Sequence, residues 1–209
     1  MVQLFVTIKH TKMKKTRKIG IVTALLVSLS LASQAQTTTS GNSSSGTTGK
    51  EWRISVGPDA GIPLGDFSNE YNWNFGGSAQ VDIPIIKSLY VTVNAGYQNF
   101  FVKNGSFADN VADKNLQLIP VKAGLKYFFL GDLLYVQGEA GASFLANKSD
   151  VGASNAAAFV YAPQVGVLLK LAPKNYIDVG FRFEGTSSFY NGGSSNNFLG
   201  LRVAYAFGL

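Results

Sequence analysis

The sequence has no cysteine and a single histidine, His10, which lies in the first segment of the chain. Without cysteine the protein has no disulfide, no thiolate metal site and no cysteine-linked lipid anchor. Without histidine beyond residue 10, it lacks the side chain used most often as a general base and as a metal ligand. We therefore expect a protein that is not an enzyme, with no catalytic residue, no metal site and no cofactor.

Acidic residues are absent before residue 36, where six of the eighteen basic residues lie. The rest of the chain has twelve basic and twelve acidic residues, so the formal net charge of +6 belongs to the N-terminal segment alone. A nucleic-acid-binding domain needs a basic face within its fold. The charge distribution therefore predicts no nucleic-acid partner.

The N-terminal segment has the three parts of a secretory signal peptide. A basic stretch over 14–18 precedes an apolar run over 19–31 and the small residues SQA, after which we expect cleavage between Ala35 and Gln36. Met13 is an alternative start, and a retained membrane anchor is the alternative interpretation, although the apolar run is short for one. The expected domains are a signal peptide at 1–35, a flexible Ser/Thr/Gly leader at 36–50 and a folded domain at 51–209.

Beyond residue 50 the sequence lacks any apolar run of 18 residues, which excludes a helical membrane protein. Segments of about ten residues alternate between apolar and polar positions instead, and this period of two predicts β-strands. Short connections such as LGD and APK alternate strictly with long polar loops, so all long loops meet at one end of the sheet. The strands are expected at 51–62, 73–84, 89–102, 115–129, 133–145, 159–171, 175–187 and 197–208, and the long loops at 63–72, 103–114, 146–158 and 188–196.

This pattern is typical of bacterial outer-membrane barrels, in which strands of about ten residues cross the bilayer. In the last strand, for example, Leu201 and Val203 share one face and Arg202 lies on the other. The sequence therefore predicts an all-β fold, an eight-stranded antiparallel up-and-down transmembrane β-barrel. The alternative is a water-soluble sandwich or barrel, which would turn its apolar face inward.

Charged residues occupy the face of the strands opposite to the apolar one. An eight-stranded barrel has just enough interior space for its own side chains, and charges are tolerated there when they are paired. The sequence thus predicts a salt-bridge network that closes the lumen. Its expected members are Arg53, Asp59, Asp82, Lys122, Lys126, Glu139, Lys170, Asp178, Arg182, Glu184 and Arg202.

Two carboxylate pairs are candidates for acid–base chemistry, Asp178 with Glu184 and Asp109 with Asp113. The first pair belongs to the predicted interior network, where ion pairing accounts for it. The second lies in a long loop, where carboxylates are ordinarily solvated. We therefore assign neither pair a catalytic role.

Aromatic residues gather near the predicted strand ends, where a membrane barrel has its interfacial girdles. The group toward the short turns is Trp52, Tyr127, Phe128, Phe129, Tyr135, Tyr176 and Phe207, and the group toward the long loops is Trp73, Phe75, Phe100, Phe101, Phe144, Phe159 and Phe198. Aromatic residues in the loops are candidate contacts for an external partner, with girdle membership as the alternative. These are Phe67, Tyr71, Phe107, Phe189 and Tyr190.

Over residues 51–209 the chain resembles the small outer-membrane β-barrel proteins of Bacteroidetes, the OmpA/OmpX-like or "porin family" group. The features that carry the resemblance are the strand pattern, the glutamine that follows SQA, and the closing LRVAYAFGL, whose alternating apolar residues lead to an aromatic one. The chain departs from that pattern because Gly208 and Leu209 follow Phe207. The resemblance implies a place in the outer membrane of a Gram-negative bacterium, contact with its lipid and lipopolysaccharide, and insertion by the barrel-assembly machinery.

Four functions remain open at this point. We expect a structural or surface-interaction barrel that acts through its long extracellular loops and has a closed lumen. The alternatives are a narrow channel for small solutes, an accessory barrel in secretion or outer-membrane biogenesis, and a soluble periplasmic carrier resembling a lipocalin. We assign no external ligand or protein partner.

Overall fold

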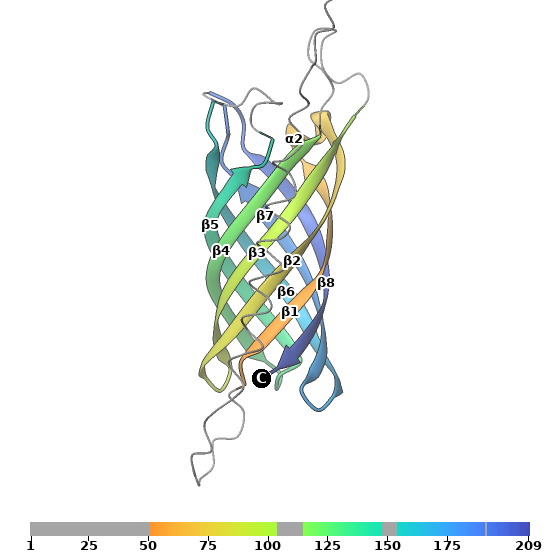
Figure 1. Ribbon diagram of the computed structural model, residues 1–209, viewed down its shortest axis with the longest axis vertical. Coiled ribbons are helices and arrows are strands. Elements are labelled where there is room, and N and C mark those ends of the chain that lie inside the picture. The colour runs from red at the N-terminus through yellow and green to blue at the C-terminus, as the bar shows by residue number, and fades with distance from the viewer. Residues whose placement is uncertain (1–50, 104–114, 148–153, 191) are drawn as a thin grey trace, which may run out of the picture. The chain divides into compact units, whose positions relative to one another are not determined.

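A computed structural model describes residues 51–103, 115–147, 154–190 and 192–209, which form one closed barrel of eight antiparallel strands (Figure 1). Every predicted strand is present, with ends that differ from the prediction by no more than two residues, so the predicted fold class is confirmed. The signal peptide and leader predicted at 1–50 lie outside the described residues. The strands are β1 (Arg53–Leu64), β2 (Tyr71–Ile86), β3 (Leu89–Val102), β4 (Leu116–Phe129), β5 (Leu134–Leu145), β6 (Ala157–Ala172), β7 (Asn175–Thr186) and β8 (Asn196–Gly208).

The connections divide the barrel into two unlike ends. Short turns join β2 to β3, β4 to β5 and β6 to β7 at the turn end, where the C-terminus also lies (Figure 1). The longer connections meet at the opposite, loop end, and the first of them contains the single-turn helix α2 (Phe67–Glu70). No helix in the described part of the chain is long and apolar enough to cross a membrane.

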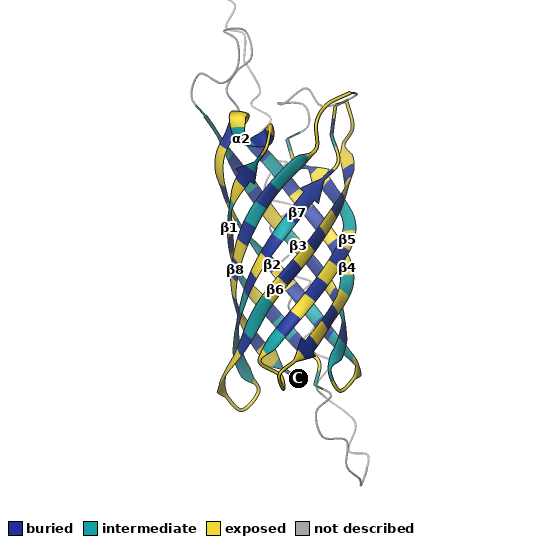
Figure 2. Ribbon diagram, turned by 180° about the vertical axis from the view of Figure 1, so that it is seen from behind, coloured by how far each residue is buried: buried dark blue, intermediate teal, exposed yellow. Residues whose placement is uncertain are grey.

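The alternation of side chains along each strand produces two unlike faces, visible as alternating bands of burial in Figure 2. In β3, Thr92 and Asn94 are buried inside the barrel, while the intervening Val93 is 45% exposed on the outer face. Successive side chains of a strand point to opposite sides of the sheet, so a polar residue at every second position fills the interior with polar groups. The apolar residues between them form the outer face.

The barrel closes where β1 pairs with β8, with Arg53 opposite Gly208 and Leu64 opposite Asn197. The ladder between these strands is interrupted at Pro58, and the ladders between β3 and β4 and between β6 and β7 are interrupted at Pro120 and Pro163. Proline has no backbone N–H and cannot donate to a ladder. Each proline therefore loosens the pairing on one side of its strand without opening the closed sheet.

Candidate functional site: the interior of the barrel

Charged side chains line the interior along most of the barrel. Ten of the eleven residues predicted for the interior network lie there, each with at most 5% of its surface exposed. Five are basic and five are acidic, so the formal charges of this set cancel. The basic members are Arg53, Lys122, Lys126, Arg182 and Arg202, and the acidic members are Asp59, Asp82, Glu139, Asp178 and Glu184.

The prediction was wrong for the eleventh residue, Lys170, which is exposed. The alternation along β6 points its side chain inward, but the pairing of β6 with β7 becomes irregular between Lys170 and Ala172. All residues over 169–173 are exposed, because this end of β6 extends past the packed interior. Lys170 therefore remains in contact with solvent at the turn end.

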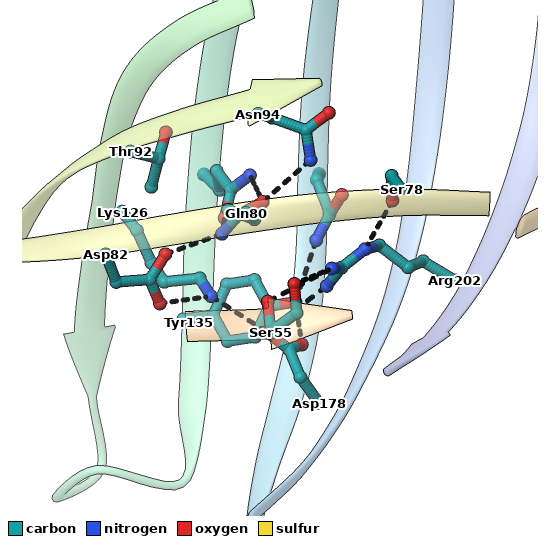
Figure 3. A network of polar contacts seen from close by, with 12 residues as sticks. Ser55, Ser78, Gln80, Asp82, Thr92, Asn94, Lys126, Tyr135, Asp178 and Arg202 are labelled. Atoms are coloured by element: carbon teal, nitrogen blue, oxygen red, sulfur yellow. Dashed lines mark hydrogen bonds and ion pairs between the residues drawn. The ribbon is translucent and has the colours of Figure 1, made fainter. Parts of the chain in front are cut away.

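Lys126 lies at the centre of the first of two ion clusters (Figure 3). Its Nζ is 3.0 Å from Asp82 Oδ2 and 2.9 Å from Asp178 Oδ2. The Tyr135 hydroxyl donates a hydrogen bond of 2.6 Å to the other oxygen of Asp178, and Arg202 Nη1 is 3.8 Å from Oδ2 of the same carboxylate. These groups come from β2, β4, β5, β7 and β8, so the cluster ties together strands on opposite walls of the barrel.

Neutral side chains add hydrogen bonds to this cluster. The amide of Gln80 donates to Asp82 Oδ1 at 2.6 Å, and Asn94 donates to Gln80 at 3.2 Å (Figure 3). Arg202 donates to the hydroxyls of Ser78 and Ser55 at 2.9 and 3.0 Å. Buried charges are stable only when their hydrogen-bonding groups are also satisfied, so these polar residues are part of the network.

The second ion cluster lies nearer the loop end and is built on Glu184. Lys122 Nζ is 2.5 Å from Glu184 Oε2 and 3.9 Å from Glu139 Oε2. Arg182 bridges to the other wall, with its Nη2 2.9 Å from Asp59 Oδ1 and its Nε 3.4 Å from Glu184 Oε2. The carboxylates of Asp178 and Glu184 thus belong to different ion clusters, and each is held by cations. Neither is arranged as one half of an acid–base pair.

Above the ion clusters, the loop end of the interior is filled by apolar side chains, which we call the loop-end layer. Phe67 of α2 packs against Tyr71 and Phe100, with ring centroids 4.8 and 5.0 Å apart. Phe100 in turn contacts Phe198 of β8 at 5.3 Å. The members of the layer are Phe67, Tyr71, Phe100, Leu116, Leu118, Leu145, Ala158, Phe189 and Phe198.

This layer overturns three of the predicted external contacts. Phe67, Tyr71 and Phe189 are 4%, 6% and 1% exposed, so they fill the interior and are not available to a partner. Phe67 and Phe189 reach this layer from the connections, and Tyr71 reaches it from the first position of β2, because burial of large apolar side chains is favourable. Tyr190 is 43% exposed, as an external contact requires. Phe107 lies outside the described residues, and so do Asp109 and Asp113 of the second carboxylate pair.

A second apolar layer, the turn-end layer, fills the opposite end of the interior. It consists of Tyr90, Phe128, Tyr135, Leu168 and Ala206, with Tyr176 packed against it. The guanidinium carbon of Arg53 lies 4.2 Å from the centroid of the Tyr90 ring and 4.8 Å from that of Phe128. Cation–π attraction therefore holds Arg53 among aromatic rings.

The two layers also correct the predicted girdles. Phe128 and Tyr135, assigned to the turn-side girdle, and Phe100 and Phe198, assigned to the loop-side girdle, are buried inside the barrel. Tyr176, also assigned to the turn-side girdle, packs against the turn-end layer and so faces the interior. The remaining residues of the two groups are exposed or partly exposed. Position near a strand end fixes the depth of a residue in the membrane but not its face. The alternation along β3, which places Phe100 with Thr92 and Asn94, was the signal that could have identified the error.

Titratable groups beyond the strands gather on the loop end near α2. Partial burial and the nearby Asp66 carboxylate raise the pKa of Glu70 above its ordinary value. Partial burial and the charge of Glu70 raise the pKa of Tyr190 in the same way. Both shifts favour the protonated forms, because burial and the nearby negative charges each oppose ionisation. In the described part of the chain no group of three or more His, Cys, Asp or Glu residues could hold a metal ion.

A closed antiparallel barrel with an apolar outer face and an ion-paired interior defines the class of the transmembrane β-barrels. The family model for the outer membrane protein beta-barrel domain matches residues 21–207, and the chain belongs to this family. It is a small β-barrel protein of the outer membrane of Gram-negative bacteria, a location that a soluble periplasmic carrier does not have. No curated protein sequence matches the chain.

Solved structures similar to this chain include other small barrels. The outer membrane protein AlkL, studied in DMPC bilayers, is 16% identical with a TM-score of 0.49, covering 83% of this chain and 97% of its own. Ail, the attachment invasion locus protein of Yersinia pestis, is 15% identical with a TM-score of 0.48, covering 77% and 100%. A de novo designed transmembrane β-barrel is 11% identical with a TM-score of 0.42, covering 78% and 98%.

Proposed function

We propose that this protein is a non-enzymatic, non-conducting barrel with a structural or surface-interaction role in the outer membrane. The observation that carries the proposal is the filling of the interior by three successive layers. The ion clusters lie in the middle, the loop-end layer lies above them, and the turn-end layer, which holds Arg53, lies below. A solute crossing the barrel would have to displace all three.

The charge balance supports a structural interior over a selective pore. Selectivity for ions is built from rings of one charge sign around an open path, whereas here five cations and five anions lie among one another. Lys126 contacts two carboxylates at 3.0 and 2.9 Å, so an incoming ion would compete with a bound counter-charge. Breaking such buried pairs costs several kcal/mol, which opposes conduction.

Single-channel recording in planar lipid bilayers tests this proposal. We expect the purified, refolded protein to give no stable conductance steps, because no layer opens without loss of its packing. A double variant, Lys126→Ala with Asp178→Ala, is the matched comparison, since it removes both signs of charge from one cluster and leaves the apolar layers. Stable, large conductance steps in the unmodified protein would contradict a closed lumen. Small, uniform steps would instead support the narrow channel for small solutes.

The partners we propose are those of the membrane itself. The outer face carries the apolar side chains that lipid and lipopolysaccharide acyl chains contact, among them Val165 at 54% exposure and Leu201 at 49%. Insertion of such a barrel would proceed through the barrel-assembly machinery. Of the predicted loop contacts within the described residues, Tyr190 alone is exposed enough to meet an external partner. Membership in the Bacteroidetes group remains part of the proposal, resting on SQAQ and LRVAYAFGL.

A further inference from the structure

Arg53 is the exception among the buried charged side chains. The other nine each take part in an ion pair with a described residue, at distances between 2.5 and 3.9 Å. Arg53 is 4% exposed, has no ion pair within the described residues, and its Nη2 has no hydrogen-bond partner there. The guanidinium therefore has no ion-paired counter-charge among the described residues, and an anionic group held in an adjoining space would supply one.

A cavity of about 150 Å³ adjoins Arg53 at the turn end. Its lining is Glu51, Arg53, Tyr90, Asp132 and Tyr176. The aromatic walls come from β3 and β7 and fix the guanidinium, whose carbon lies 4.2 Å from the Tyr90 centroid and 5.8 Å from that of Tyr176.

The cavity also carries two carboxylates on its rim. Asp132 is exposed in the turn between β4 and β5, where Leu130 and Gly131 adopt positive φ angles of 64° and 65°. This conformation is favoured by glycine and reverses the chain tightly. Glu51, directly before β1, is half-buried on the rim. The site thus has a fixed donor inside and two anionic groups outside it.

We infer that this cavity binds a small zwitterion, with its oxyanion on Arg53 and its primary ammonium group between Glu51 and Asp132. A simple anion would be attracted by Arg53 but repelled by the two rim carboxylates, and a simple cation would leave the guanidinium without an acceptor. A molecule that carries both charges a few bonds apart satisfies all three groups at once. The small volume limits the ligand to the size of a free amino acid or of the ethanolamine headgroup of a phospholipid, which share this chemistry.

NMR of the arginine side chains tests the inference with an internal control. Three of the four arginines in the sequence, Arg53, Arg182 and Arg202, lie in the barrel, and the last two are in ion pairs. The full chain, labelled with ¹⁵N-arginine and refolded in phosphatidylcholine nanodiscs, is titrated with O-phosphoethanolamine. We expect a saturable shift of the Arg53 Nε–H signal, with those of Arg182 and Arg202 unchanged. Inorganic phosphate or ethanolamine alone should require about tenfold higher concentrations, because each lacks one charge-assisted contact.

Two variants separate the zwitterion from a simple anion. Asp132→Asn should weaken binding of O-phosphoethanolamine about tenfold without weakening that of phosphate, while Asp66→Asn, the same change at the loop end, should alter neither. Replacing phosphatidylcholine by phosphatidylethanolamine in the nanodiscs identifies the source of the zwitterion. A shifted Arg53 signal in these nanodiscs indicates a lipid headgroup. An unshifted signal that still responds to O-phosphoethanolamine indicates a free zwitterion. No shift with either, or equal binding of phosphate and O-phosphoethanolamine, would overturn the inference.

Discussion

Lys126 shows what one buried ammonium group does inside this barrel. It contacts Asp82 and Asp178 at 3.0 and 2.9 Å, and these carboxylates come from strands β2 and β7 while the lysine comes from β4. Its side chain also lies over the Tyr135 ring, with Nζ 4.3 Å from the centroid. Removing the lysine would leave Asp82 without an ion-pair partner among the described residues and Asp178 with Arg202 alone, 3.8 Å away. Burying a carboxylate without its cation is more unfavourable than the loss of the pair itself.

We expect Lys126→Met to destabilise the folded barrel by about 3–5 kcal/mol, the usual effect of breaking a buried ion pair on one side. The matched control is Lys170→Met, which makes the same change in an exposed lysine and should alter stability by less than about 0.5 kcal/mol. Urea unfolding in lipid vesicles, followed by the fluorescence of Trp52 and Trp73, gives both values. Equal effects of the two substitutions would show that the network contributes nothing to stability.

Gly166 is required because the Tyr135 side chain lies directly over it. A Cβ atom added at Gly166 would lie 2.3 Å from the Tyr135 hydroxyl, whereas one added at Gly138 would meet no atom within 4 Å. We expect Gly166→Ala to destabilise the barrel by about 1–3 kcal/mol, since a side chain forced out of its position strains a packed interior. It should also break the hydrogen bond from Tyr135 to Asp178.

The control for this prediction is Gly138→Ala, which should leave stability within about 0.5 kcal/mol of the unmodified protein. The urea unfolding midpoint measures stability, and the near-ultraviolet circular dichroism of the tyrosines reports the displacement of Tyr135. If Gly166→Ala and Gly138→Ala had equal effects, the close packing of Tyr135 would not explain why position 166 requires glycine.

At the scale of elements, the strands were predictable and the filling of the interior was predictable only in part. The period of two fixed the strands and the faces of residues such as Arg202, because alternation is a local property of the chain. The strand members of the loop-end layer, such as Phe100, follow from the alternation, but Phe67 and Phe189 could not be foreseen, because they lie in connections without any period. The isolation of Arg53 depends on which strands meet across the lumen. Which strands face one another follows from the closure of the barrel and from the register of strand pairing, and the pattern within a single strand determines neither.

The single-turn helix α2 adds a pH-dependent element to the loop end. Burial and the charge of Asp66 raise the pKa of Glu70 above its ordinary value near 4.5. A raised folded-state pKa means that the protonated carboxyl is favoured by the fold, so its stabilising effect is full below pH 4.5 and is lost as the pH rises through the raised pKa. At neutral pH the ionised Glu70 therefore opposes the folding of this end.

We expect Glu70→Gln to be more stable than the unmodified protein at pH 7 and indistinguishable from it below about pH 4.5, where Glu70 is protonated in both states. Urea unfolding at a series of pH values measures the difference. Asp132→Asn, which removes a carboxylate at the other end of the barrel, serves as the control for the change of net charge. A difference between Glu70→Gln and the unmodified protein that grows as the pH falls would contradict the sign of the pKa shift.

At the scale of the whole molecule, the membrane and the interior impose opposite demands on neighbouring residues. Gln164 is 5% exposed and faces the lumen, while the adjacent Val165 is 54% exposed and faces lipid. A one-residue slip of β6 would exchange these environments and place the polar face of the strand against hydrocarbon. The environments inside and outside the barrel therefore fix the register together.

Positions on the lipid-facing side of β6 differ in their depth in the bilayer. Val165 lies near the middle of β6 and Leu171 near its turn end, and both are exposed, at 54% and 61%. A basic side chain on the lipid face costs about 2–4 kcal/mol at the bilayer midplane but only about 0–1 kcal/mol near the interface. Val165→Arg should therefore lower the free energy of unfolding in phosphatidylcholine vesicles by the larger amount, about 2–4 kcal/mol. It should also reduce the fraction of protein that runs as the compact band on unheated gels. Leu171→Arg is the matched control, with the same new side chain on the same strand. Because only depth differs between the two positions, equal costs would contradict a membrane centred on the middle of the strands.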